Sequence, residues 1–184
     1  AVDAVPNRGP FAEGIRDVIR WHEEHDDWRI TRQLIHDKYW AYKSAELEAP
    51  VSIVSSLNNG LTGIMALLYG EGDYTKTVGI ATSAGYDSDN QAATLGGLIG
   101  TMKGMKGLNN DVVTRMKTLD ASWEWETPFN DTYVNISRDE IALRTPITEI
   151  AARIVAIAEQ AIRDNGGRMI SNNGEIYYVV NSDI

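Results

Sequence analysis

Apolar residues recur at intervals of three and four along most of this 184-residue chain, and that spacing is the feature that most limits its possible folds. Side chains spaced in this way share one face of an α-helix. The pattern predicts helices over residues 11–25, 28–42, 52–69, 74–84, 91–103 and 146–164. No linker is long enough to separate two domains, so we expect a mainly α fold with a single domain over residues 1–184.

Residues at the expected helix ends agree with these boundaries. Asp27 and Asp73 each precede a helix, where a carboxylate can accept a hydrogen bond from a free backbone N–H. Thr145 suits the N-cap of the last helix, and Pro146 suits its first position. The apolar stripe of that helix, which we expect to be buried, consists of Ile147, Ile150, Ile154, Ile157 and Ala161.

One segment near the C-terminus departs from helical spacing. The stretches 168–171 and 175–180 flank Asn172-Asn173-Gly174. Asn-Gly between two alternating stretches is a strong signal for a tight β-hairpin. We therefore expect a small C-terminal β-hairpin beside the helices.

Composition excludes several classes of function. The absence of cysteine excludes disulfides and thiolate metal sites. A net charge of −9 without a cluster of lysine and arginine makes nucleic acid an unsuitable partner. Apolar runs stay shorter than the ~20 residues that cross a bilayer, so no membrane span is expected. No signal peptide is visible at the start, and the compartment stays open.

The segment Gly85-Tyr86-Asp87-Ser88-Asp89-Asn90 carries the candidate chemistry. Two carboxylates in one turn can direct oxygen atoms at a single point, and such oxygens are the ligands that Mg²⁺ prefers. A calcium loop of the EF-hand type is excluded, because its glycine and its last glutamate would be Ala92 and Leu98. A pair of glycosidase carboxylates, ~5 to 9 Å apart, is unsuited to residues this close in sequence. A polar turn that caps the helix over 91–103 remains an alternative.

A wider pattern surrounds this segment. Asn58-Asn59, the break Gly70-Glu-Gly-Asp73 and Gly85-x-Asp87-x-Asp89 are followed by small residues, namely Ala92, Ala93, Gly96, Gly97, Gly100 and Gly104. Over residues 35–108 this resembles the C-terminal half of the ADP-ribosylglycohydrolase family, which is related to dinitrogenase reductase-activating glycohydrolase. The family motif reads Gly-Gly-Asp-Thr-Asp-Thr, and its acids and last threonine hold two divalent cations in an all-helical fold.

The resemblance implies a fold, an activity and a set of site residues. We expect an all-helical ADP-ribosylglycohydrolase-like bundle, to which the small hairpin is added. Its implied activity is metal-dependent hydrolysis of the glycosidic bond between ADP-ribose and a modified protein side chain or small acceptor. Asp87, Asp89 and Asn90 would hold one or two Mg²⁺ ions, and Asp87 and Asp89 would be catalytic. Tyr86 and Ser88 would contact the substrate, an ADP-ribosylated molecule or ADP-ribose.

The chain also departs from the family pattern. Tyr86 replaces the second glycine of the motif, and Asn90 replaces the threonine ligand. Two N-terminal family segments that complete the metal shell, Gly-Asp-Ala and Thr-Asp-Asp-Thr, do not occur. The sequence thus resembles a half molecule, and we expect its partner to be the N-terminal half of the same protein or another chain. The alternative is a non-catalytic binding or structural relative on the same scaffold.

Overall fold

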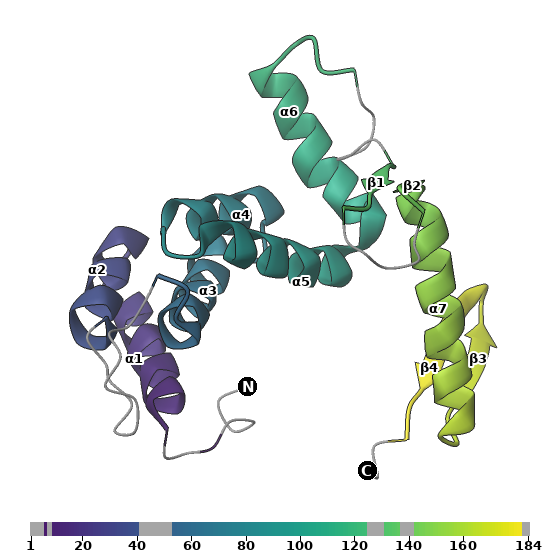
Figure 1. The fold of residues 1–184 in the computed structure, drawn as a ribbon, viewed down its shortest axis with the longest axis horizontal. Coiled ribbons are helices and arrows are strands. Elements are labelled where there is room, and N and C mark those ends of the chain that lie inside the picture. Colours follow the sequence, from purple (N-terminus) through teal and green to yellow (C-terminus); the bar gives the residue numbers. More distant parts are fainter. Residues whose placement is uncertain (1–5, 7–8, 41–52, 125–130, 137–141, 182–184) are drawn as a thin grey trace. The chain divides into compact units, whose positions relative to one another are not determined.

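The computed structural model describes residue 6 and residues 9–40, 53–124, 131–136 and 142–181. Along the chain (Figure 1) the elements are α1 (Pro10–Glu24), α2 (Trp28–Tyr39), α3 (Ser56–Gly70), α4 (Tyr74–Ser83), α5 (Ser88–Leu108), a π-helical turn η2 (Asn109–Val113), α6 (Thr114–Leu119), β1 (Tyr133–Val134), β2 (Arg144–Thr145), α7 (Ile147–Asp164), β3 (Arg168–Asn172) and β4 (Glu175–Val179). The predicted mainly α fold with a small C-terminal hairpin is confirmed. In this described part, no helix has the length and apolar character needed to cross a membrane.

The chain divides into two compact units, Ala1–Pro128 and Phe129–Ile184. Unit 1 contains α1 to α6, and unit 2 contains α7 and both strand pairs. A single domain over residues 1–184 stays a prediction.

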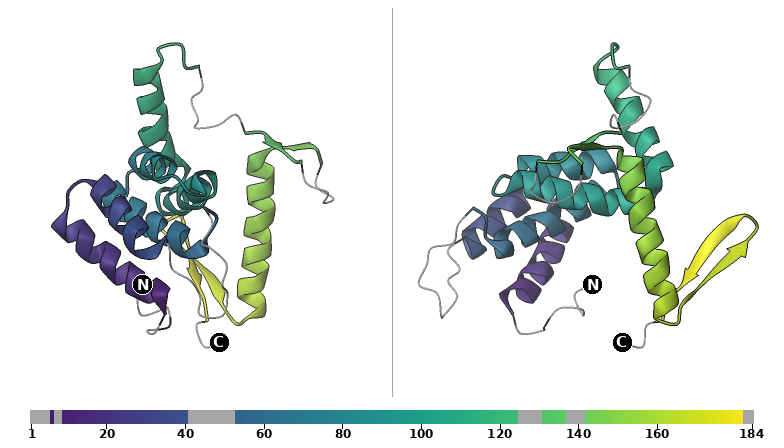
Figure 2. Two further views of the ribbon diagram at one scale, coloured as in Figure 1. Left: turned by 60° about the vertical axis from the view of Figure 1, so that its left-hand side comes forward. Right: turned by 45° about the vertical axis from the view of Figure 1, so that its right-hand side comes forward.

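Helix α3 lies at the centre of unit 1, in contact with α1, α2, α4 and α5. Its neighbours approach closely where glycine leaves room: the side chain of Leu61 fills the space that a Cβ on Gly14 would occupy, at 2.6 Å. Figures 1 and 2 show α1 and α2 beside α3. The most deeply buried apolar residues come from these three helices and are Val18, Ile35, Leu61, Met65 and Ala66. Burial of these side chains is the main force that holds the helices together.

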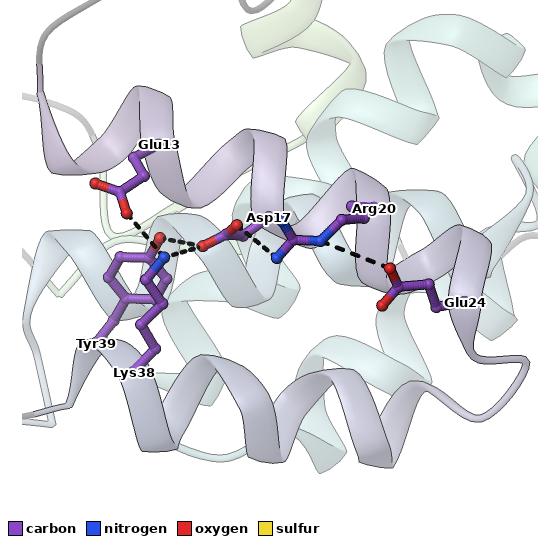
Figure 3. A network of polar contacts seen from close by, with 6 residues as sticks. All are labelled: Glu13, Asp17, Arg20, Glu24, Lys38 and Tyr39. Atoms are coloured by element: carbon purple, nitrogen blue, oxygen red, sulfur yellow. Dashed lines mark hydrogen bonds and ion pairs between the residues drawn. The ribbon is translucent and has the colours of Figure 1, made fainter.

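A polar network joins α1 to α2 (Figure 3). Asp17, which is 6% exposed, accepts hydrogen bonds from Lys38 Nζ at 2.5 Å, from the Tyr39 hydroxyl at 2.7 Å and from Arg20 at 2.8 Å. Lys38 also lies 2.8 Å from Glu13. A buried carboxylate is tolerated because its oxygens are fully paired in this way.

The helix ends in unit 1 follow the sequence in two cases and differ in a third. Asp27 accepts a hydrogen bond from the Arg29 N–H, and Asp73 accepts one from the Lys76 N–H, so both predicted caps are confirmed. Helix α5, however, begins at Ser88 and continues to Leu108. The predicted span of 91–103 is therefore too short. Gly104 adopts a non-helical backbone, with φ of 63°, and kinks the helix without ending it.

In unit 2, the last helix differs from the prediction at its N-cap and in its burial. Helix α7 starts at Ile147, Pro146 takes the N-cap position, and Thr145 lies in β2. The apolar stripe is present but not buried: no residue of α7 is buried, and Ile157 is 70% exposed. Amphipathic spacing identifies the apolar face of a helix and leaves open what covers it.

The C-terminal hairpin is confirmed. Strands β3 and β4 pair in antiparallel register, with Asn172 opposite Glu175. Asn173 and Gly174 both have positive φ, of 51° and 82°, as a two-residue hairpin turn of type I′ requires. The hairpin leaves the C-terminal end of α7 at an angle (Figure 2).

Candidate metal and substrate site

The beginnings of α3 and α5 meet at Asn59. Its side-chain oxygen accepts a hydrogen bond from the backbone N–H of Asp87 at 3.0 Å. Its side-chain nitrogen donates to the carbonyl groups of Ser55 at 2.9 Å and Ile53 at 2.8 Å. One buried carboxamide therefore fixes the acidic turn to the N-terminal end of α3.

A pocket of about 430 Å³ opens between these two helices. Its polar lining comes from both helices, with Ser56 and Asn59 from α3 and Asp87, Asn90, Gln91 and Thr94 from α5 and its N-cap. Its apolar lining includes Ile64, Leu67 and Leu95. Apolar walls with a few polar groups are typical of sites for small organic ligands.

Glycine at position 63 shapes this pocket. A Cβ on Gly63 would lie 2.7 Å from the Gln91 side-chain oxygen, so the absence of a side chain lets the carboxamide of Gln91 lie over α3. No hydrogen bond from that carboxamide to another described residue is present. Gln91 thus presents both a donor and an acceptor at the pocket wall.

Asp87 lines the pocket and lies close to Asp89. Partial desolvation raises the pKa of Asp87 above its ordinary value, and the hydrogen bond and negative charge of Asp89 raise it further. No cation among the described residues pairs with Asp87 to lower it. A divalent cation beside such a carboxylate favours its ionised form.

The capping alternative for this turn is contradicted. Asp87 occupies the N-cap position of α5, yet its side chain makes no capping hydrogen bond. The usual structural use of an aspartate at this position is therefore absent, and the carboxylate is not occupied by the backbone N–H groups of its own helix.

The other predicted site residues take different positions. Ser88 is the first residue of α5, while Asp89 and Asn90 are exposed in its first turn. Of these three, only Asn90 lines the pocket. The described part of the chain holds no group of three or more histidine or acidic side chains able to bind a metal. Two carboxylates and one carboxamide fit the oxygen preference of Mg²⁺ and would fill only part of its shell.

Tyr86 faces α2. Its hydroxyl is hydrogen-bonded to His36 Nδ1 at 2.8 Å, and its ring stacks on Trp40 with 5.5 Å between centroids. The Arg32 guanidinium lies over the ring at 4.7 Å. Burial raises the pKa of Tyr86, with an opposing effect from Arg32. Tyr86 is not among the described residues that line the pocket, and its predicted contact with substrate stays a prediction.

The family model for ADP-ribosylglycohydrolase matches residues 1–160. The chain belongs to the ADP-ribosylglycohydrolase family. No curated protein and no solved structure matched it.

The family match is longer than the region of the sequence that resembles the family motif. That region covered residues 35–108, whereas the family match also includes α1 and most of α7. Family membership suggests glycohydrolase activity and the handling of ADP-ribosylated substrates.

Sequence reasoning missed two residues of this candidate site. Asn59 was part of the recognised pattern, but its role in fixing the acidic turn requires the packing of α3 against α5. Gln91 stands one residue beyond the acidic segment. Gln91 follows Asp87 by four residues, and side chains with this spacing share one face of a helix. The sequence alone could therefore have predicted that the two side chains lie on the same face.

Proposed function

We propose that this protein is a metal-dependent hydrolase that cleaves the glycosidic bond between ADP-ribose and a modified protein side chain or small acceptor. The observation that carries the proposal is the pair Asp87 and Asp89, free of capping bonds and of described cationic partners, beside a pocket in a chain of this family. In the reaction, water adds to the anomeric carbon of the ribose, the glycosidic bond breaks, and the departing group takes a proton.

Asp87 and Asp89 would hold one or two Mg²⁺ ions, with the Asn90 carboxamide oxygen as a further ligand. Bound cations of this kind orient ribose hydroxyls and activate water for attack at the anomeric carbon. Asn59 would keep Asp87 in place through its bond to the backbone N–H. Because Mg²⁺ retains several waters when few protein oxygens bind it, a partial set of ligands is compatible with binding.

The pocket beside the acids suits part of an ADP-ribosyl group. Ile64, Leu67 and Leu95 offer an apolar wall for the flat face of a base or sugar. Asn90, Gln91 and Thr94 offer donors and acceptors for hydroxyl groups. We infer that the remaining metal ligands come from another segment, either the N-terminal half of the same protein or a separate chain.

The test is release of ADP-ribose from mono-ADP-ribosylated peptides of N- and O-glycosidic linkage by the protein together with the segment or chain that completes its metal shell. Release is measured by chromatography with Mg²⁺ and with excess chelator. We expect release that the chelator abolishes. Asp87→Asn and Asp89→Asn should each slow it by at least about a hundredfold, since metal-held charge supplies several kcal/mol. Asp37→Asn, an exposed acid on α2, is the matched control and should retain full activity. Unchanged release with chelator would refute the metal dependence.

A non-catalytic relative is the second candidate. It is favoured by the lack of a third acidic or histidine ligand in the described part of the chain. This candidate predicts that no linkage is cleaved at saturating Mg²⁺, even when ADP-ribose binds. Binding without release would therefore replace the hydrolase proposal.

A further inference from the structure

Tyr86 has a backbone conformation that its own side chain does not favour. Its φ is 59°, in the left-handed region that costs a non-glycine residue about 1 kcal/mol or more. Gly85 before it has φ of 81°. Since Asp87 follows directly, this turn sets the direction in which its carboxylate leaves the backbone. A strained residue persists when surrounding contacts hold it.

Those contacts come from one face of α2. Arg32, His36 and Trp40 are spaced by four residues, so they lie in one row along the helix and its end. We name them the α2 cluster. Arg32 contributes twice, because its Nε donates to the Ala84 carbonyl at 3.0 Å while its guanidinium covers the Tyr86 ring.

The acidic turn is thus held from two sides. The α2 cluster holds its beginning at Ala84 and Tyr86, and Asn59 of α3 holds the Asp87 N–H. We propose that Tyr86 is a positioning residue: through the α2 cluster, helix α2 fixes the turn so that Asp87 and Asp89 converge. This inference rests on the proposed function for the role of the two acids. It assigns α2, which contributes no described residue to the pocket, a part in the site.

The test compares Tyr86→Phe, His36→Phe and the double variant. Each single change removes the same hydrogen bond and keeps an aromatic ring. We expect Mg²⁺ affinity, measured by calorimetry, to fall about two- to tenfold in each single variant, as for loss of one hydrogen bond. The double variant should lose little more, because the bond is already absent. In ADP-ribose release, kcat at fixed subsaturating Mg²⁺ should fall while KM for the ADP-ribosylated peptide stays constant.

Tyr69→Phe is the matched control. Its hydroxyl also connects to α2, through the Thr31 hydroxyl at 2.7 Å, and donates to the His25 carbonyl, but it lies away from the acidic turn. This variant should lower the melting temperature and leave Mg²⁺ affinity unchanged. An equal loss of affinity in Tyr69→Phe would overturn the proposal, because general loosening of the helices would then explain the effect.

Two further results would also overturn it. Wild-type Mg²⁺ affinity in Tyr86→Phe with only a raised KM would mean that Tyr86 contacts substrate directly. Amide hydrogen exchange at Asp87 gives a readout independent of metal, and we expect it to accelerate in Tyr86→Phe. If exchange of the Asp87 amide were the same in Tyr86→Phe and in the wild type, the positioning role would be refuted. If the wild-type protein bound no Mg²⁺, the proposed function would fail instead, and the exchange measurement would still test the positioning role.

Discussion

At the residue scale, the site depends on side chains whose backbone and neighbours leave them available. Asp87 occupies a capping position without capping, and Gln91 lies over α3 because position 63 is glycine. Both features can be tested without altering the acids. The relevant contact at Gly63 is with the flexible end of Gln91, so a small side chain there should move Gln91 more than it disturbs the fold.

Gly63→Ala should therefore weaken binding of ADP-ribose by about three- to tenfold, the effect of one hydrogen bond, while changing the melting temperature by only a few degrees. Gly79→Ala in α4 is the control, since a Cβ there meets nothing within 4 Å. It should stabilise the protein by about 0.5–1 kcal/mol and leave binding unchanged. Equal binding by Gly63→Ala and the wild type would remove Gln91 from the site.

At the element scale, α1 and α2 are joined by the network around Asp17 (Figure 3), which makes their packing sensitive to acid. Burial alone would raise the pKa of Asp17. Hydrogen bonds from Lys38 and Tyr39, with the charges of Lys38 and Arg20, outweigh it and hold the pKa below its ordinary value of 3.8. A carboxyl group with a lowered pKa in the folded state stabilises the fold above its unfolded pKa and loses that effect as pH falls.

Asp17→Asn should accordingly lower the free energy of unfolding at pH 7 by roughly 1–3 kcal/mol, the range for hydrogen bonds to charged groups. The difference from wild type should begin to shrink as pH falls below about 4, where Asp17 becomes protonated in the unfolded chain, and should vanish only below its lowered folded-state pKa, where Asp17 is protonated in both states. Urea denaturation between pH 3 and 7 measures this. Asp37→Asn, whose carboxylate is exposed on α2, is the control. A difference that stays constant with pH would contradict the role of the Asp17 charge.

The positions of the helices were the part of the fold that the sequence predicted best, because caps and apolar periodicity depend on residues that are close together in the chain. Asp27 and Asp73 marked their helices correctly. The predicted helix over 91–103 stops before Gly104, whereas the structure has a kink at Gly104 and continues to Leu108, because a glycine in the sequence indicates a kink and a helix end equally well. The two acids were found from their spacing. Asn59 and the α2 cluster were not identified as supports of the turn, because their contacts join residues 28 to 52 positions apart in the chain.

At the scale of the whole molecule, a ligand that binds only the folded state must raise its stability. The acidic turn is tied to α2 and α3, so Mg²⁺ bound there would stabilise the helices of unit 1 together.

Thermal melts with Mg²⁺ and ADP-ribose should therefore show a higher melting temperature than melts with either ligand absent. At a free ligand concentration a hundredfold above Kd, the gain is about 2.7 kcal/mol. Asp87→Asn should abolish the Mg²⁺ part of the shift. An identical shift in Asp87→Asn and wild type would place the cation elsewhere.

The most direct measurement is anomalous diffraction from crystals of the protein grown with Mn²⁺, which replaces Mg²⁺ at oxygen-rich sites. We predict a peak within coordination distance, about 2.0–2.4 Å, of carboxylate oxygens from both Asp87 and Asp89. A peak bound by other residues, or no peak at saturating Mn²⁺ with the turn intact, would contradict the account.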